Sequence, residues 1–146
     1  MVNIKDRSNI MFSSIVFITI CIDQLLKYIV QSTNVNIGNN FIRIHFIKNT
    51  GAGFGILQNQ MILLTIISFI VAVILISQYK RISKERLPQV VFALFLGGVL
   101  GNFIDRVSRG YVVDFIDLSF WPVFNIADAA ITVAVIGIIV YYWKKK

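Results

Sequence analysis

Apolar residues dominate four stretches of the chain, approximately residues 9–30, 60–77, 88–107 and 126–143. Each stretch approaches the roughly 20 apolar residues that an α-helix needs to cross the hydrocarbon core of a bilayer. Polar and charged residues gather in the connections between the stretches. The pattern therefore predicts an all-α polytopic membrane protein whose four transmembrane helices form a single membrane domain over residues 1–146.

The first apolar stretch follows Lys5 and Arg7, an arrangement that also occurs in cleaved signal peptides. Such a peptide needs small residues at its cleavage site, and no alanine occurs before Ala52. The apolar character also resumes after the polar pair at residues 23–24. We therefore expect this stretch to be a retained transmembrane helix.

The connection between the first two helices has a different pattern. Residues 41–47 read F-I-R-I-H-F-I, and this partly alternating run of β-branched and aromatic residues predicts a strand. The segment N-T-G-A-G-F-G follows at residues 49–55, and its three glycines predict a tight turn or a close backbone approach. The sequence thus predicts a small β element between helices 1 and 2.

Lysine and arginine residues predict the orientation of the helices. One set of flanks holds nine of them, which are Lys5, Arg7, Lys80, Arg81, Lys84, Arg86, Lys144, Lys145 and Lys146. The opposite flanks hold three, which are Arg43, Lys48 and Arg109. Because cytoplasmic loops are enriched in these residues, both termini are predicted to be cytoplasmic and the β element to be extracytoplasmic.

Composition supports a membrane protein and narrows the chemistry. Hydrophobic residues make up 57% of the chain, and the mean hydropathy is +0.77. The net charge of +7 comes from clusters beside apolar runs, so we do not expect nucleic-acid binding. With His45 as the only histidine, sites built from several histidine ligands are excluded. Cys21 is the only cysteine, and we expect it to be a buried small hydrophobic residue.

Two polar groups interrupt the apolar stretches, where ionisable residues are rare and usually functional. Asp23 and Lys27 are four residues apart and share a helix face, which is compatible with a structural ion pair or a direct role. The second group is G-G-V-L-G-N-F-I-D-R at residues 97–106, whose glycines predict a groove that leads to Asn102 and Arg106. Interfacial snorkelling would also account for Arg106, and a helix–helix hydrogen bond would account for Asn102.

Three aspartates lie in the apolar segment of residues 112–128, although burial of a carboxylate is unfavourable unless it is paired or protonated. Asn125 is a candidate N-cap of the last helix, and Asp128 in the first turn would suit the helix dipole. Small alanines around Asp128 instead leave space for a ligand. Asp114 has bulky apolar neighbours, while Asp117 has a solvated loop position as its simplest interpretation.

Carboxylates are therefore the candidate reactive groups of this chain. Two aspartates that lie close together share a proton near neutral pH, so that one activates water while the other polarises a carbonyl. From the residues alone, the hypothesis is a membrane aspartyl hydrolase of unspecified substrate.

Four motifs occur together, namely N-x-G at 49–51, G-N-F-I-D-R at 101–106, V-V-D-F-I-D at 112–117 and F-N-I-A-D at 124–128. Their order and spacing resemble the lipoprotein signal peptidases (signal peptidase II) of bacteria over nearly the whole chain. The resemblance implies that Asp114 and Asp128 are the catalytic pair, with Asp117 outside it. It also implies a set of substrate-binding or supporting residues, which are Asn49, Gly51, Asn102, Arg106, Asn125, Asp23 and Lys27.

The resemblance further implies a membrane endopeptidase of the bacterial cytoplasmic membrane, with its active site at the outer face. Its substrates would be diacylglyceryl-modified prolipoproteins, cut just before the lipidated cysteine, with the acyl chains in the glycine groove and on apolar helix faces. The expected partners are this substrate and membrane lipids, without nucleic acid, and we expect a monomer. No metal and no organic cofactor is expected.

A different class of function fits part of the same pattern. In a non-catalytic four-helix lipid-binding or transporter-associated protein, the aspartates would be helix caps and ties between helices. A coupled pair of Asp114 and Asp128 would distinguish the peptidase from this alternative.

Overall fold

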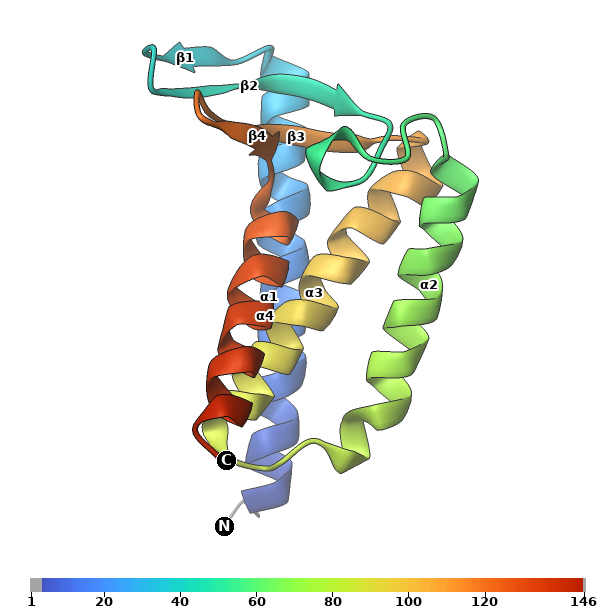
Figure 1. The fold of residues 1–146 in the computed structure, drawn as a ribbon, viewed down its shortest axis with the longest axis vertical. Coiled ribbons are helices and arrows are strands. Elements are labelled where there is room, and N and C mark those ends of the chain that lie inside the picture. The colour runs from blue at the N-terminus through green and yellow to red at the C-terminus, as the bar shows by residue number, and fades with distance from the viewer. Residues whose placement is uncertain (1–3, 146) are drawn as a thin grey trace.

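The structure is a computed structural model that describes residues 4–145 (Figure 1). Four long helices form a bundle, namely α1 (Ile4–Thr33), α2 (Met61–Gln78), α3 (Arg86–Arg109) and α4 (Ile126–Trp143). All four are long and apolar enough to cross a membrane, so the predicted number of spans is confirmed. The helix ends differ from the prediction mainly at α1, which begins before residue 9, and at α3, which is longer at both ends. Lys146 lies outside the described residues.

Helix α3 is the centre of the bundle and contacts the other three helices. In its membrane-spanning window 56% of the residues are buried, against 11–17% in the other helices, whose remaining surface is apolar and suits contact with lipid. One core cluster joins Phe12 of α1, Leu75 of α2 and Leu96 of α3. Helix α2 is peripheral and leans mainly on α3 (Figure 1).

The glycines of α3 do not line an open groove, which corrects the prediction made from their spacing. A Cβ added at Gly97 would lie 2.8 Å from Thr19 of α1, and one at Gly101 would lie 2.8 Å from Asp23 of the same helix. A Cβ added at Gly98 would lie 2.5 Å from the carbonyl oxygen of Ala127 in α4. The small residues thus allow α1 and α4 to approach α3 closely, and helices fill the space expected for acyl chains.

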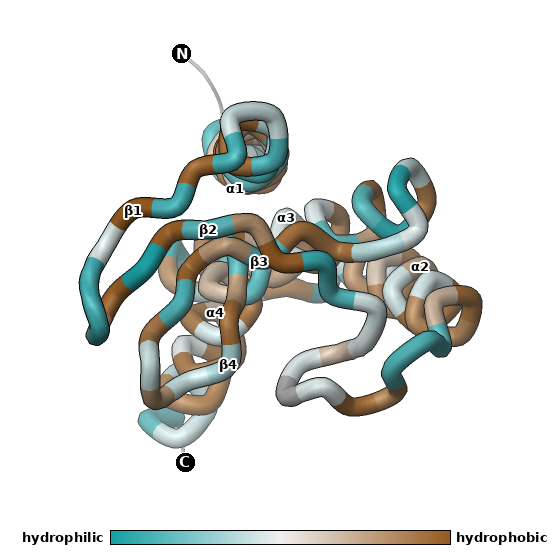
Figure 2. The backbone as a smooth tube through the Cα atoms, turned by 90° about the horizontal axis from the view of Figure 1, so that it is seen from above, coloured by the Kyte–Doolittle hydropathy of each residue, from teal (hydrophilic) through white to brown (hydrophobic). Residues whose placement is uncertain are grey.

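A four-stranded antiparallel sheet lies across one end of the bundle, opposite the end where α1 begins and α4 finishes (Figures 1 and 2). Its order is β1-β2-β3-β4, with strands β1 (Asn36–Gly38), β2 (Ile42–Asn49), β3 (Val112–Leu118) and β4 (Trp121–Phe124). The predicted strand is β2. The β element predicted between helices 1 and 2 is half of this sheet, and the connection between α3 and α4 supplies the other half, which was not predicted.

The strand β3 was not predicted, because a strand that is buried on both faces lacks the usual alternation of apolar and polar residues. It is a central strand, and its first four residues are all buried. Val113 and Phe115 form a second core cluster with Val30 of α1, which fixes the sheet to the helix ends. Two short 3-10 turns, Gly53–Gly55 and Tyr79–Arg81, complete the fold.

Candidate active site

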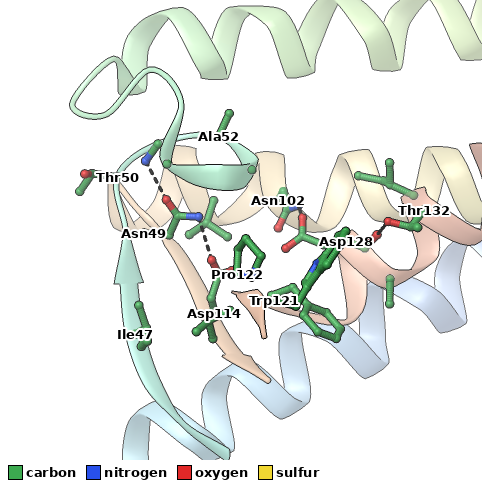
Figure 3. Close-up of a pocket in the computed structure, with 18 of the residues that line it drawn as sticks. Ile47, Asn49, Thr50, Ala52, Asn102, Asp114, Trp121, Pro122, Asp128 and Thr132 are labelled. Atoms are coloured by element: carbon green, nitrogen blue, oxygen red, sulfur yellow. Dashed lines mark hydrogen bonds between the residues drawn. The ribbon is translucent and has the colours of Figure 1, made fainter. Parts of the chain in front are cut away.

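Asp114 is the third residue of β3, and a sharp turn after α3 places this strand across the end of the bundle. Gly110 ends α3 in the left-handed conformation (φ 73°), which glycine adopts without strain, and β3 begins two residues later. Asp114 is 2% exposed. Asn49 at the end of β2 donates from Nδ2 to Asp114 Oδ2 at 2.7 Å, and its own Oδ1 accepts from the backbone N–H of Gly51 at 2.8 Å (Figure 3). The glycine turn is therefore tied to this carboxylate.

Asp128 lies in the first turn of α4, where Asn125 is the N-cap. The Asn125 Oδ1 accepts from the Asp128 backbone N–H at 2.9 Å, and Asp128 Oδ2 accepts from the Asn125 backbone N–H at 3.2 Å. This reciprocal pair is a capping box, so the predicted N-cap is confirmed. The cap fixes the Asp128 side chain at the helix end and leaves its Oδ1 for another donor.

Asn102 and Asn125 join the two aspartates. Asn102 of α3 donates from Nδ2 to Asp128 Oδ1 at 2.7 Å. Asn125 donates from Nδ2 to Asp114 Oδ1 at 2.7 Å, with Asn102 Oδ1 at 3.1 Å from the same nitrogen. The structure thus brings Asp114, Asp128, Asn49, Asn102 and Asn125 into one hydrogen-bonded group. These hydrogen bonds to the two carboxylates come from side-chain and backbone amides.

The group opens onto a pocket of about 880 Å³. Its polar wall includes Asn49, Gly51, Asn102, Arg106 and both aspartates, and Figure 3 shows several of these side chains around the space. Its apolar wall includes Leu118, Phe120, Val123, Phe124, Ile131 and Val133, which come from β3, the turn after it, β4 and α4. The pocket can therefore hold a ligand that has both a polar and an apolar part.

Arg106 offers a donor that the protein leaves unused. Its Nη1 donates to Ser68 Oγ of α2 at 3.1 Å. Its Nε is buried and has no hydrogen-bond partner among the described residues. Because an unpaired buried donor is unfavourable, a ligand acceptor in the pocket would stabilise it.

The environment of Asp114 favours its protonated form. Burial, together with the negative charge of Asp128, raises the pKa of Asp114 to about 7, although the hydrogen bonds from Asn49 and Asn125 and the charge of Lys27 lower it. Neither Asp114 nor Asp128 forms an ion pair with lysine or arginine within the described part of the chain. Because the charge of Asp128 acts on Asp114 and no cation neutralises either carboxylate there, one of the two can hold a proton near neutral pH.

Asp23 and Lys27 lie behind this group and form the predicted ion pair. Lys27 Nζ is 2.7 Å from Asp23 Oδ2, and both side chains are fully buried. Lys27 Nζ is also 2.9 Å from Asp105 Oδ2, a contact that the sequence did not suggest. Neither Asp23 nor Lys27 lines the pocket, so neither has the geometry for direct contact with a ligand there.

Comparison with known proteins places this geometry in a family. A family model described as signal peptidase (SPase) II matches residues 15–144. The chain belongs to the signal peptidase II family. Lipoprotein signal peptidases from Bacillus pumilus and Moorella thermoacetica are 42% and 38% identical to it. Those alignments cover 84% and 91% of this chain and 85% and 91% of the relatives.

Two solved structures, each described as a bacterial membrane enzyme, have the same fold. Their TM-scores are 0.85 and 0.82, both at 36% identity. They cover 91% and 92% of this chain, and 87% and 94% of their own lengths. The bundle and the small sheet are thus features that this signal peptidase II chain has in common with solved membrane enzymes.

The signal peptidase II motifs converge at the pocket, with some exceptions. Asp117 lies on β3 but bonds to His45 of β2 at 3.0 Å, away from the acidic pair. His45 is on a strand, as predicted. Cys21 is exposed on α1, where an apolar side chain can face lipid, which corrects the expectation that it is buried. Among residues 4–145, no group of three or more His, Cys, Asp or Glu side chains that could hold a metal was found.

The sequence places Asp105 in the polar cluster with Asn102 and Arg106 but predicts no role for it at the site. Asp105 is fully buried, and its Oδ2 accepts from the backbone N–H of Val113 at 3.0 Å. Its signal was present, since an aspartate three residues after Asn102 near the end of a transmembrane helix is unusual. The sequence did not indicate that this carboxylate turns toward Lys27 rather than toward the pocket.

Proposed function

We propose that the protein is an aspartyl endopeptidase that removes signal peptides from diacylglyceryl-modified prolipoproteins, with Asp114 and Asp128 as its catalytic pair. One observation carries the proposal: the buried Asp114 and the partly buried Asp128 meet at one pocket, joined by asparagine amides and without a cation partner among residues 4–145. The names of the relatives, lipoprotein signal peptidases, support the substrate class.

The chemistry follows from one proton shared by two carboxylates. The ionised aspartate takes a proton from a water molecule, and the water oxygen attacks the carbonyl carbon of the scissile peptide bond. The protonated aspartate donates to the carbonyl oxygen, which gives a neutral tetrahedral intermediate. When this intermediate collapses, the C–N bond breaks, the leaving nitrogen takes the proton of the protonated aspartate, and a hydroxyl group of the intermediate returns a proton to the ionised one, which restores the shared proton. The proton belongs to the pair as a unit rather than to one named residue.

The two walls of the pocket suggest how the substrate lies. The peptide would cross the polar wall, where the Nε of Arg106 is available to a carbonyl oxygen of the substrate. The apolar wall, with Phe120 and Val133, would hold the acyl part of the lipidated cysteine. This replaces the expected glycine groove as the lipid site. Such a division would favour lipidated over unmodified precursors.

The basic residues support an outward-facing active site. Lys80, Arg81 and Lys145 lie at the end of the bundle away from the sheet, and this end is expected to be cytoplasmic. The sheet and the pocket would then lie at the outer face of the bacterial cytoplasmic membrane, where a lipid-anchored precursor is exposed after export. We propose a monomer, because the residues that bound the pocket all come from one chain.

A cleavage assay on matched precursors tests the proposal. Purified protein in lipid bicelles is given a diacylglyceryl-modified precursor peptide, or the same peptide with an unmodified cysteine. We expect cleavage of the lipidated peptide alone, just before the cysteine. Asp114→Asn and Asp128→Asn should each reduce the rate by at least about 10³-fold, since each removes a member of the reacting pair.

Controls separate lost chemistry from lost folding. Each variant should insert and unfold like the wild type, and Asp117→Asn should cleave normally. A wild-type cleavage rate in either Asp114→Asn or Asp128→Asn would contradict the assignment of the catalytic pair. Binding of the lipidated peptide without any cleavage by the wild type would favour the non-catalytic lipid-binding alternative.

A further inference from the structure

A second group of buried charges lies between α1 and α3, directly behind the acidic pair. Asp23, Lys27 and Asp105 are each fully buried. The three protons of the Lys27 ammonium have three acceptors, Asp23 Oδ2 at 2.7 Å, Asp105 Oδ2 at 2.9 Å and Asn102 Oδ1 at 3.1 Å. Arg109 pairs with Asp105 from the other side, so two acids face two bases.

The two acids of this group hold the backbone next to the two proposed catalytic residues. Asp23 Oδ1 accepts from the backbone N–H of Ala127 at 2.9 Å, one residue before Asp128. Asp105 Oδ2 accepts from the backbone N–H of Val113 at 3.0 Å, one residue before Asp114. Since Lys27 bridges the two acids, it links the backbone on both sides of the pocket.

The third contact of Lys27 fixes an amide. Asn102 Oδ1 faces the ammonium, which cannot accept a hydrogen bond, so the other end of the amide must present its NH₂ group to Asp128. The same Asn102 Oδ1 also accepts from Asn125, the donor to Asp114. One lysine therefore sets the orientation of the hydrogen-bond donors to both carboxylates.

We propose that Lys27 is a positioning residue for peptide cleavage, which bridges Asp23 and Asp105 and thereby fixes the separation and hydrogen bonding of Asp114 and Asp128. The inference rests on the proposed function and adds a defined role to side chains that do not line the pocket. Lys27 does not touch the substrate in this arrangement. It acts through Asn102 and through two backbone N–H groups.

A bridging cation has an electrostatic consequence that a packing residue lacks. The positive charge of Lys27 lowers the pKa of Asp114, and a negative charge at the same distance has the opposite effect. Loss of Lys27 therefore moves the alkaline limb of the pH–rate profile, where the pair loses its proton, to higher pH. Loss of either acid, with Lys27 retained, moves that limb to lower pH.

The test compares variants that keep the charges balanced. In the double variant Asp23→Asn with Lys27→Met, Asp105 keeps Arg109, and the new amide oxygen at position 23 can still accept from Ala127. We expect an unfolding midpoint close to that of the wild type. The kcat for the lipidated peptide should fall by about 10–100-fold with KM changed by less than about 3-fold, because the pair is misplaced rather than the substrate site. The alkaline limb should stay within about half a pH unit of the wild type, because the lost charges of Lys27 and Asp23 shift it in opposite directions.

Single variants keep the inference testable if the double variant does not fold. Asp23→Asn and Asp105→Asn each retain Lys27 and its bond to Asn102, and their alkaline limbs should fall by roughly half to one pH unit. An unchanged limb in these variants, or wild-type kcat in a folded double variant, would overturn the role of Lys27. Failure of the proposed function looks different, because then Asp114→Asn would cleave normally or the wild type would not cleave at all.

Discussion

Two groups of carboxylates that are buried or partly buried in this protein have different hydrogen-bond partners. Asp23 and Asp105 are bonded to Lys27 and Arg109, lie away from the pocket and hold backbone N–H groups. Asp114 and Asp128 are bonded to amides and face the pocket. The two groups are joined through a single side chain, Asn102, which contacts both Lys27 and Asp128.

The difference shows how one small bundle can use the same side chain for two purposes. A buried carboxylate with a cation partner accepts hydrogen bonds from that cation and from backbone N–H groups, which suits a structural tie. A buried carboxylate with only amide partners and a second acid nearby retains a proton near neutral pH, which suits proton transfer. The hydrogen-bond donors around an aspartate therefore determine whether it has a structural role or a proposed role in proton transfer.

The largest expected effect is on folding and concerns the group that contains Lys27. Lys27→Met leaves Asp23 without a cation and weakens the pairing of Asp105, so we expect a loss of about 3–5 kcal/mol in the free energy of unfolding. Asp114→Asn should cause no loss at neutral pH, because it replaces an acid that has no cation partner. Denaturation in detergent measures both.

Lys145→Met is the matched control for this comparison. It removes a lysine from the exposed pair with Glu85 at the opposite end of the bundle. The unfolding midpoint should remain that of the wild type. A stability loss in Asp114→Asn as large as that in Lys27→Met would contradict the division between the two groups.

The next effect concerns Asn102, which belongs to both groups. Asn102→Ala removes the donor to Asp128 Oδ1 and the third acceptor of Lys27. We expect kcat to fall by about 10²-fold, which is the usual size of the effect when a donor to a reacting oxygen is lost. Asn40→Ala in the exposed turn after β1 is the control, and its kcat should match the wild type. A kcat within 3-fold of the wild type in Asn102→Ala would show that the amide is dispensable.

The third effect is the pH dependence of stability. The pKa of Asp114 is about 7 in the folded protein, above the ordinary value for aspartate, so the folded state binds this proton more tightly than the unfolded state. Its contribution to stability is fully present below about pH 4 and is lost progressively as the pH rises to and through 7, with a total of at most about 4 kcal/mol. Thermal unfolding at pH 5 and pH 8 should show this decline.

Asp114→Asn removes the titrating group and should flatten that decline. At pH 8 the variant should therefore be more stable than the wild type, while at pH 5 the two should be similar. An equally steep decline in the variant would show that other groups cause it. A gain in stability that accompanies a loss of cleavage is typical of a residue retained for chemistry.

The sequence predicted the helices and most of the candidate site for a simple physical reason. Long apolar runs must be helical in a membrane, and ionisable residues within them are conspicuous. Asn102, Arg106, Asn125 and Asp128 follow from spacing along single helices. The capping box at Asn125 is also a local feature, which depends on residues three apart.

The remaining features depend on contacts between distant segments. The strand β3 is buried on both faces, so its pattern does not alternate and resembles an irregular connection. The glycines of α3 suggested an open groove, but whether a small-residue stripe faces lipid, ligand or another helix depends on the position of α1 and α4. Asp105 and Asn102 lie near one another on α3, and only the packing of α1 determines which of them ties the backbone and which reaches the pair.

The smallest expected effect concerns Asp117, which lies three residues from Asp114 on the same strand. Asp117 and His45 are each about a quarter exposed, and their side chains meet across β2 and β3 at 3.0 Å. Such a solvated pair stabilises a fold by less than ~1 kcal/mol. Asp117→Asn should therefore change kcat by less than about 3-fold and leave the alkaline limb of the pH–rate profile in place, since no cation or amide of the acidic pair is altered. A shift of that limb would mean that the charge of Asp117 reaches the proposed catalytic pair. The Asp117–His45 pair would then have to be counted among the groups that affect cleavage.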